Sequence, residues 1–164
     1  MIEPWRLLVD SAALKHGIEQ ALLAAIIQTE SGGDMWVTRY EPQYNYLYFA
    51  RNNAENNKIT VATEETLQRM SWGLTQLMGG VCRELGFEGQ IPQMITPELN
   101  LDYACRFIKQ KQQKYGDDPC VTYAAYNAGS IRKLPSGFYV NQKNVDRFYS
   151  IYQTMTLTFK GDKP

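Results

Sequence analysis

The chain has 164 residues, 44% of them hydrophobic, so it is long enough for one domain with a substantial core and too apolar to be disordered. Lys and Arg number 17, as do Asp and Glu, and the resulting net charge of zero excludes a nucleic-acid binder that depends on bulk positive charge. The three cysteines are odd in number and lack metal-ligand spacing, which favours free thiols, with Cys82 and Cys105 buried on apolar helix faces.

Two helices are expected to open the chain. Residues 4–16 form the first, which Gly17 ends, and we expect His16, the sole histidine, to cap it rather than to act in catalysis. Residues 19–31 form the second, which a Gly-Gly pair ends. The N-terminus has no basic region followed by an apolar one, so no signal peptide is expected, and no apolar run reaches the roughly 20 residues of a membrane span.

One carboxylate lies at the end of this second helix. Ile26 and Ile27 lie four and three positions before Glu30, and Leu23 lies seven before it, so all three share its face. Desolvation and the negative end of the helix dipole both disfavour the ionised form, which predicts a raised pKa for Glu30. A carboxyl that stays protonated near neutral pH is what a general acid requires, and glycoside cleavage is the commonest chemistry built on one. The alternative interpretation is a helix-capping or salt-bridged Glu.

Residues 34–61 are polar, aromatic and rich in Asn, which predicts a long loop with one short helix around residues 46–53. Many of the 11 Tyr, 6 Phe and 3 Trp fall between Trp36 and Phe49, and again between Phe138 and Tyr152. Core packing is expected to explain most of them. Exposed rings would also suit a sugar-binding groove, because pyranose faces stack on aromatic rings.

The rest of the chain has helical patterns, and strand signals are weak throughout. We expect a short helix over residues 63–70 capped by Thr63, a half-buried helix over 74–85, and longer helices over 97–116 and 119–128. A last helix opens at Asn141. Its inner stripe comprises Val145, Phe148, Tyr149 and Tyr152. The sequence therefore predicts an all-α (or α-dominant α+β) fold in a single domain over residues 1–164, with its core at about 4–155.

Two later segments have the composition of a ligand site. Residues 71–78 place a glycine and Gln76 at the start of a predicted helix, and residues 123–129 place Tyr126 and Asn127 at the end of another. Small residues let the backbone approach a ligand closely, and amides donate and accept hydrogen bonds at once. Each segment alone usually just satisfies backbone groups. Their order after the Glu30 segment is much more specific.

Glu-Ser-Gly at residues 30–32, Gly-Leu-Thr-Gln-Leu-Met at 73–78 and Ala-Tyr-Asn-Ala-Gly at 125–129 resemble the three signature motifs of the lytic transglycosylase domain related to goose-type lysozyme. The resemblance runs from about Leu7 to about Tyr152. It implies a lysozyme-like helical domain, peptidoglycan as the substrate, and Glu30 as acid and then base on the bond from N-acetylmuramic acid to N-acetylglucosamine. The residues expected to bind substrate or orient the acid are Ser31, Gln76, Tyr123, Tyr126 and Asn127, with Glu41 added from the loop.

The sequence departs from the family pattern at two places. Thr75 replaces the methionine of the usual Gly-Leu-Met-Gln motif, and its polarity is expected to alter the fit beside the sugar. The segment between the first two motifs is longer than usual, and Arg39-Tyr40-Glu41-Pro42 stands in place of a serine-proline turn.

Two product chemistries are open. If the C6 hydroxyl of the substrate attacks, the product has a 1,6-anhydro end, and this is the favoured outcome; if a second carboxylate holds water, hydrolysis follows as in goose-type lysozyme. Asp34 and Glu41 are the acidic candidates close in sequence to Glu30. Asp34 is expected to be solvated after the Gly-Gly turn, and Glu41 to pair with Arg39 or Arg51. A non-catalytic glycan-binding or scaffold protein is the rival class.

No metal or cofactor is expected, because a single histidine excludes most zinc hydrolases and no glycine-rich phosphate loop is present. The expected partner is the glycan strand of peptidoglycan, with no nucleic acid and no membrane span, and the expected state is a monomer. Without an export signal, the protein is expected to be made in the cytoplasm and to act on the cell wall after release. A phage endolysin, a virion-carried protein or a secreted domain would fit.

Overall fold

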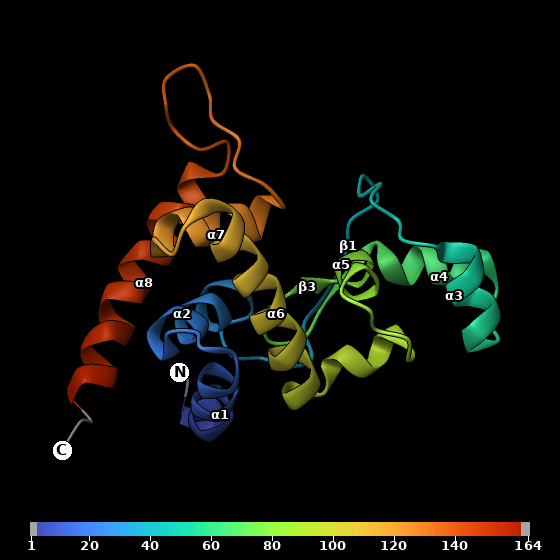
Figure 1. The fold of residues 1–164 in the computed structure, drawn as a ribbon, viewed down its shortest axis with the longest axis horizontal. Coiled ribbons are helices and arrows are strands. Elements are labelled where there is room, and N and C mark those ends of the chain that lie inside the picture. Colours follow the sequence, from blue (N-terminus) through green and yellow to red (C-terminus); the bar gives the residue numbers. More distant parts are fainter. Residues whose placement is uncertain (1–2, 162–164) are drawn as a thin grey trace.

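The computed structural model describes residues 3–161, and helices dominate it, as the sequence predicts. A small three-stranded sheet lies between the helices (Figure 1). The prediction of one domain over residues 1–164 extends at both ends into residues that lie outside this range. The elements in chain order are η1 Glu3–Trp5, α1 Arg6–His16, α2 Gln20–Glu30, β1 Thr38–Tyr40, α3 Ala50–Asn57, α4 Val61–Gln68, β2 Met70–Trp72, β3 Leu77–Met78, α5 Gly79–Glu84, η2 Ile91–Ile95, α6 Pro97–Tyr115, α7 Pro119–Ala128 and α8 Gln142–Gly161.

The helix α2 is the buried centre of the fold. Every residue from Ala21 to Ile27 is buried, and α2 packs against α8 (Figure 1). The predicted end of the first helix at His16 is confirmed, but α1 begins at Arg6, two residues later than predicted, and α2 is one residue shorter than predicted at each end. Gly17 ends α1 at φ 62°, a left-handed conformation that costs glycine little. The cap predicted for His16 is wrong, since its Nε2 lies 2.8 Å from Asp102 Oδ1 on α6 instead.

The predicted helix over residues 74–85 is wrong in its first half. Residues 73–76 form a turn between β2 and β3, whose antiparallel register pairs Trp72 with Leu77, and only α5 is helical. The turn needs left-handed backbone at Gly73 (φ 67°) and Gln76 (φ 50°), which no helix contains. A Cβ on Gly73 would lie 2.7 Å from the carbonyl oxygen of Met94, so this glycine is required by space as well as by conformation.

The segment of residues 34–61 is largely irregular, as predicted, but it also contributes the edge strand β1. Its helix α3 begins at Ala50, four residues later than expected, because Phe49 before it has left-handed backbone at φ 43°. The cap of α4 is Thr60 rather than Thr63: the Thr63 backbone N–H donates to Thr60 Oγ1 at 3.1 Å. The helix therefore runs two residues earlier than predicted.

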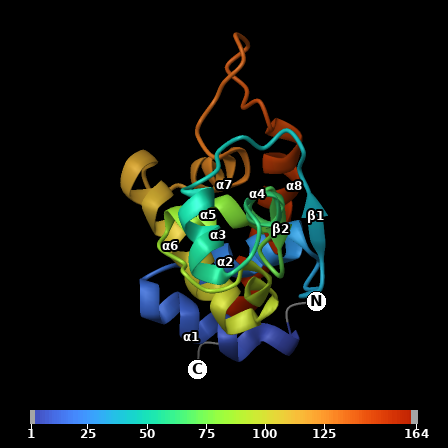
Figure 2. The same ribbon diagram turned by 90° about the vertical axis from the view of Figure 1, so that its right-hand side faces the viewer.

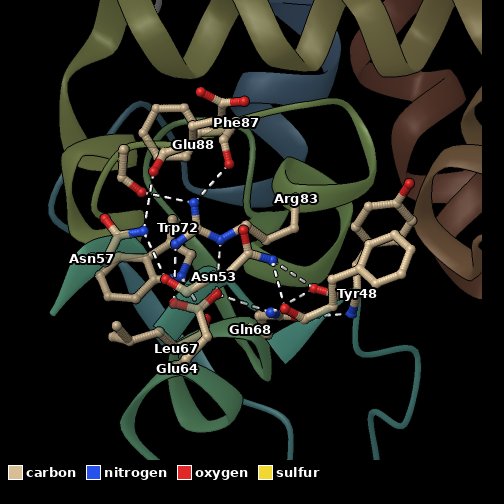
Figure 3. Close-up of polar contacts among 12 residues, drawn as sticks. Tyr48, Asn53, Asn57, Glu64, Leu67, Gln68, Trp72, Arg83, Phe87 and Glu88 are labelled. Carbon is tan, nitrogen blue, oxygen red and sulfur yellow. Dashed lines mark hydrogen bonds and ion pairs between the residues drawn. The ribbon is translucent and has the colours of Figure 1, made fainter. Parts of the chain in front are cut away.

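A buried ion pair fixes α4 against α5 (Figure 3). Arg83 donates from Nε to Glu64 Oε1 at 2.7 Å and from Nη2 to Oε2 at 3.0 Å, while its Nη1 donates to the carbonyls of Phe87 and Gly89. Gln68 Nε2 donates to Glu64 Oε1 at 2.9 Å. Because these charges are paired both electrostatically and by hydrogen bonds, the cluster is structural, and removal of one partner alone would cost about 3–5 kcal/mol.

The C-terminal helices follow the predicted bounds closely. Gly116 ends α6, and the Asp118 side chain caps α7 by accepting from the Val121 N–H at 2.9 Å. In α8 the predicted inner stripe is confirmed at Val145 and Phe148, both buried, but is wrong at Tyr149, which is 45% exposed. The thiols predicted to be buried, at Cys82 and Cys105, are buried, and burial raises the pKa of each to about 12.

Core packing does not explain the aromatic residues between Trp36 and Phe49. Most of their rings are exposed, Trp36 by 70% and Tyr46 by 82%. This segment (teal) and the connection between α7 and α8 (orange) rise on the same side of the molecule in Figures 1 and 2. That connection also carries exposed apolar side chains. They are Leu134, Phe138 and Val140.

None of the helices within residues 3–161 combines the length and apolar character needed to cross a bilayer.

Candidate active site

The carboxyl group of Glu30 is the centre of the candidate site. Glu30 is the last residue of α2 and half-buried, and the preceding Ile26 and Ile27 are completely buried. The apolar helix thus ends where the carboxyl emerges from the core. This is the placement that the spacing of the sequence predicts.

Two side chains from α7 bind the Glu30 carboxyl on the same oxygen. Tyr123 Oη donates to Glu30 Oε1 at 2.8 Å, and Asn127 Nδ2 donates to the same atom at 3.2 Å. Tyr123 and Asn127 are one helical turn apart and so share a face of α7. The Tyr123 ring stacks on Phe148 of α8 with ring centroids 4.2 Å apart, which fixes the direction of its hydroxyl.

The other carboxyl oxygen, Oε2, is free of such donors. Among residues 3–161 no group hydrogen-bonds Glu30 Oε2, and no described side-chain oxygen is both buried and unbonded, so Oε2 is open to solvent. The carboxyl therefore has an anchored oxygen and an oxygen available to a ligand.

The electrostatic surroundings of Glu30 confirm the predicted direction of its pKa. Burial raises this pKa above the ordinary 4.5, and the hydrogen bonds from Tyr123 and Asn127 and the charges of Arg39 and Arg147 lower it by less. The pKa of Tyr123 is also raised, by burial and by the neighbouring carboxylate, so its hydroxyl stays a donor. A protonated Glu30 with one oxygen open to solvent can give a proton to a bound substrate.

Ser31 connects the end of α2 to the turn between β2 and β3. Its Oγ donates to the carbonyl of Leu74 at 2.7 Å and accepts from the Gly33 N–H at 3.1 Å. Tyr126 of α7 reaches the same turn, because its buried hydroxyl donates to the carbonyl of Thr75 at 2.9 Å. Both motif residues therefore hold the turn beside Glu30.

Both the oxygen and the nitrogen of the Gln76 side-chain amide form hydrogen bonds within the protein. Nε2 donates to the carbonyls of Val37 at 2.8 Å and Gly73 at 2.9 Å, and Oε1 accepts from Ser71 Oγ at 2.8 Å. These bonds join the turn to the residue that precedes β1. Gln76 thus stabilises the sheet by connecting the turn to β2 and to the residue before β1.

The expectation that Thr75 affects the fit beside the sugar is wrong, because its side chain does not reach the surface. Its side chain is completely buried, and Oγ1 donates to Asn100 Oδ1 at 2.8 Å. The polarity at this position serves a hydrogen bond inside the protein.

Each of the two further acidic candidates has a partner of its own. Glu41 forms an ion pair with Arg39 through its Oε1, which confirms the expected partner. Both side chains are partly exposed, so the pair is a weak one. Asp34 is exposed and its Oδ1 accepts from the Trp36 N–H at 2.9 Å, in the local turn expected after the glycines.

Sequence reasoning missed a second tier of asparagines behind Asn127. Asn141 directly precedes α8 and Asn144 lies in its first turn, and their Nδ2 atoms donate to Asn127 Oδ1 at 2.9 Å and 3.1 Å. Arg147, whose charge acts on Glu30, follows one turn later. Nothing in the residue types singles these out, because polar residues at the start of a helix are equally typical of a solvated cap.

Two further observations define the limits of the site. A hollow of about 320 Å³ lies beside Tyr48, Phe49 and Phe87, and none of the three motifs lines it. Within residues 3–161 no group of three or more His, Cys, Asp or Glu side chains could hold a metal ion.

The family model of the Transglycosylase SLT domain matches residues 8–147, a range that contains Glu30, the turn at residues 73–76 and the end of α7. The chain belongs to this family. No solved structure matches it significantly. SLT domains are peptidoglycan lytic transglycosylases with a helix-dominant, lysozyme-like fold, so membership gives this protein its substrate class and its general activity.

Proposed function

We propose that this SLT domain cleaves the β-1,4 bond between N-acetylmuramic acid and N-acetylglucosamine, with Glu30 as general acid and then general base. The observation that supports this assignment is the state of the carboxyl: its pKa is raised by burial, and one oxygen is held by Tyr123 and Asn127 while the other is open. This combination is what proton donation to a glycosidic oxygen requires.

In the first step Glu30 protonates the bridging oxygen, and the bond from this oxygen to C1 of the muramic sugar breaks. The N-acetylglucosamine chain leaves with its hydroxyl restored, and C1 develops oxocarbenium character. Glu30 is now ionised, and the hydrogen bonds of Tyr123 and Asn127 stabilise this form.

In the second step the Glu30 carboxylate takes the proton of the C6 hydroxyl while that oxygen attacks C1. The product is a 1,6-anhydromuramic end, no water is consumed, and Glu30 returns to its protonated form. The Glu41 carboxylate pairs with Arg39 and takes no part in the hydrogen bonds around Glu30, which supports this outcome over hydrolysis.

Digestion of purified sacculi by wild-type protein and by Glu30→Gln, with mass spectrometry of the released sugars, tests the proposal. We expect anhydro-ended fragments from the wild type and a loss of at least about a hundredfold in rate from the variant. Glu55→Gln on the exposed face of α3 is the matched control and should keep full activity.

Three results would contradict parts of this proposal. A Glu30→Gln variant with more than about a hundredth of the wild-type rate would remove Glu30 from the role of acid. Reducing ends, heavier by one water, would indicate a goose-type hydrolase. Binding of sacculi without release of sugars would indicate a glycan-binding protein.

A further inference from the structure

Three asparagine side chains connect the start of α8 to the carboxyl of Glu30 through hydrogen bonds, with two of them donating to the third. Asn144 Nδ2 and Asn141 Nδ2 both donate to Asn127 Oδ1, at 3.1 Å and 2.9 Å, and Asn127 Nδ2 donates onward to Glu30 Oε1 at 3.2 Å. Asn141 also donates to the carbonyl of Ala124 at 3.2 Å, whereas the amide nitrogen of Asn144 is committed to Asn127. Asn144 is exposed, so its bond to Asn127 is not required by burial of its own amide.

The polarity of an amide makes this arrangement directional. An amide has a donor end and an acceptor end of nearly the same shape, and its hydrogen-bond partners decide which way it faces. If the Asn127 amide turned over, the NH₂ groups of Asn141 and Asn144 would face another NH₂ group and would have no acceptor there. The turned amide would also present an oxygen to the Glu30 carboxylate, where two acceptors repel each other.

We propose that Asn141 and Asn144 are positioning residues that act through Asn127, by locking its donor end toward Glu30 Oε1 and so leaving Glu30 Oε2 as the oxygen that carries the acid proton. Asn127 Nδ2 can only donate, so an oxygen that accepts from it, and from Tyr123 as well, has no room for a proton in the same direction. The open oxygen Oε2 is left to hold the proton that the substrate receives.

This inference rests on the proposed function for its kinetic meaning, but the lock itself can be measured without turnover. The charged and titratable groups that act on Glu30 are Arg39 of β1, Arg147 of α8, and Tyr123 and Tyr126 of α7. A variant at residue 144 leaves all four in place. A change in the titration of Glu30 would therefore report the hydrogen bond from Asn127.

The test is a carbon-13 NMR titration of the Glu30 carboxyl, assigned by the signal that disappears in Glu30→Gln. Asn144→Leu preserves the size of the side chain and removes the donor. It is made in the wild-type chain and again in Asn127→Ala. Lys143→Ala, an exposed position in the same helical turn, is the matched control. Thermal melting of each variant reports folding separately.

We expect Asn144→Leu to raise the pKa of Glu30 by about 0.5 unit in the wild-type chain, because Asn127, then held by Asn141 alone, turns over more often and stabilises the carboxylate less. In the Asn127→Ala chain the same substitution should have no effect, and Lys143→Ala should have none in either. The basic limb of the pH profile of kcat/KM should move upward with the titration.

An unchanged pKa in Asn144→Leu, whether or not the melting temperature falls, would overturn the proposal, because a purely structural contact would give that result. An equal rise in the Asn127→Ala chain would overturn it too, since Asn144 would then act without Asn127. If the wild-type protein lacked the proposed activity but Glu30 titrated as expected, the proposed function would be refuted, and the inference about how Asn127 is held would stand.

Discussion

Asn100 Oδ1 accepts two hydrogen bonds from Thr75, one from the backbone N–H at 3.0 Å and one from Oγ1 at 2.8 Å. The Asn100 amide also donates to the carbonyls of Trp72 at 2.9 Å and Met94 at 3.0 Å. One completely buried side chain of α6 thus satisfies the backbone on both sides of the turn that Ser31 and Tyr126 contact. The threonine that replaces the family's usual methionine adds the fourth bond.

Asn100→Ala should therefore destabilise the fold strongly, by about 2–4 kcal/mol, because it leaves buried backbone groups of residues 72, 75 and 94 without partners. Thr75→Val should cost only about 1 kcal/mol, because Asn100 Oδ1 keeps the backbone donor. Urea unfolding of both variants checks the order. A Thr75→Val variant that is the less stable of the two would contradict this account of the turn.

Replacement of Glu30 should stabilise the protein at neutral pH. Its pKa is raised in the folded state, so the folded wild type loses stability as pH rises from about 4.5 through the folded value. Glu30→Gln keeps an oxygen for Tyr123 and Asn127 and has no such loss. Its melting temperature should equal that of the wild type below pH 4.5 and exceed it at pH 7.

The control for this comparison is Glu55→Gln, which should follow the wild type at every pH. If Glu30→Gln were less stable than the wild type at every pH, the Glu30 carboxyl would stabilise the folded state, and its ionisation would not destabilise it.

Tyr123→Phe removes one of the two donors on Glu30 Oε1 and keeps the ring that stacks on Phe148. The ionised form of Glu30 loses a hydrogen bond, so its pKa rises further, and the basic limb of the kcat/KM profile should move up by about 0.5–1 pH unit. Stability should fall by no more than about 1.5 kcal/mol.

Tyr152→Phe is the matched control for that variant. Its hydroxyl donates to Glu19 Oε2 at the same 2.8 Å, at a carboxyl outside the site. The basic limb of the kcat/KM profile should not move in Tyr152→Phe. If Tyr123→Phe left the limb unmoved as well, the hydrogen bond to Glu30 would have no part in setting the acid.

Glu41→Gln should keep most of the activity and still release anhydro-ended fragments, because the carboxylate is engaged by Arg39 in a partly exposed pair of little energy. Mass spectrometry of the digest checks both points. Complete inactivity of this variant, together with reducing ends from the wild type, would reassign Glu41 as the group that activates water.

The sequence predicts the fold best where one physical signal acts alone. Gly17, Gly116 and Asp118 each mark a helix end by backbone conformation or by a cap, and the structure has those ends. The helix expected over residues 74–85 failed because Leu74, Leu77 and Val81 are buried for three different reasons, in a turn, a strand and a helix, at spacings that a helix would share. Left-handed backbone at Gln76 has no signal in the residue type.

The site divides in a similar way. Glu30 was predictable because the apolar face of one helix leads to it, and Tyr123 and Asn127 because their segment resembles a motif of the lytic transglycosylase family. Asn141 and Asn144 were not, since the contact with Asn127 depends on how the start of α8 meets the end of α7. That geometry is set by the tertiary packing of α7 against α8, which no local pattern encodes.

The great sequence distance between Glu30 and its partners has a consequence for biosynthesis. Tyr123 and Asn127 lie 93 and 97 positions after Glu30, and α8, which packs against α2, is made after them. A ribosome-bound chain that has exposed only α1 to α6 contains the acid with neither of its donors and with one flank of α2 uncovered. Contacts between such remote segments form late in folding, because the long loop must close first. The proton donor is thus assembled only after α7 has been synthesised.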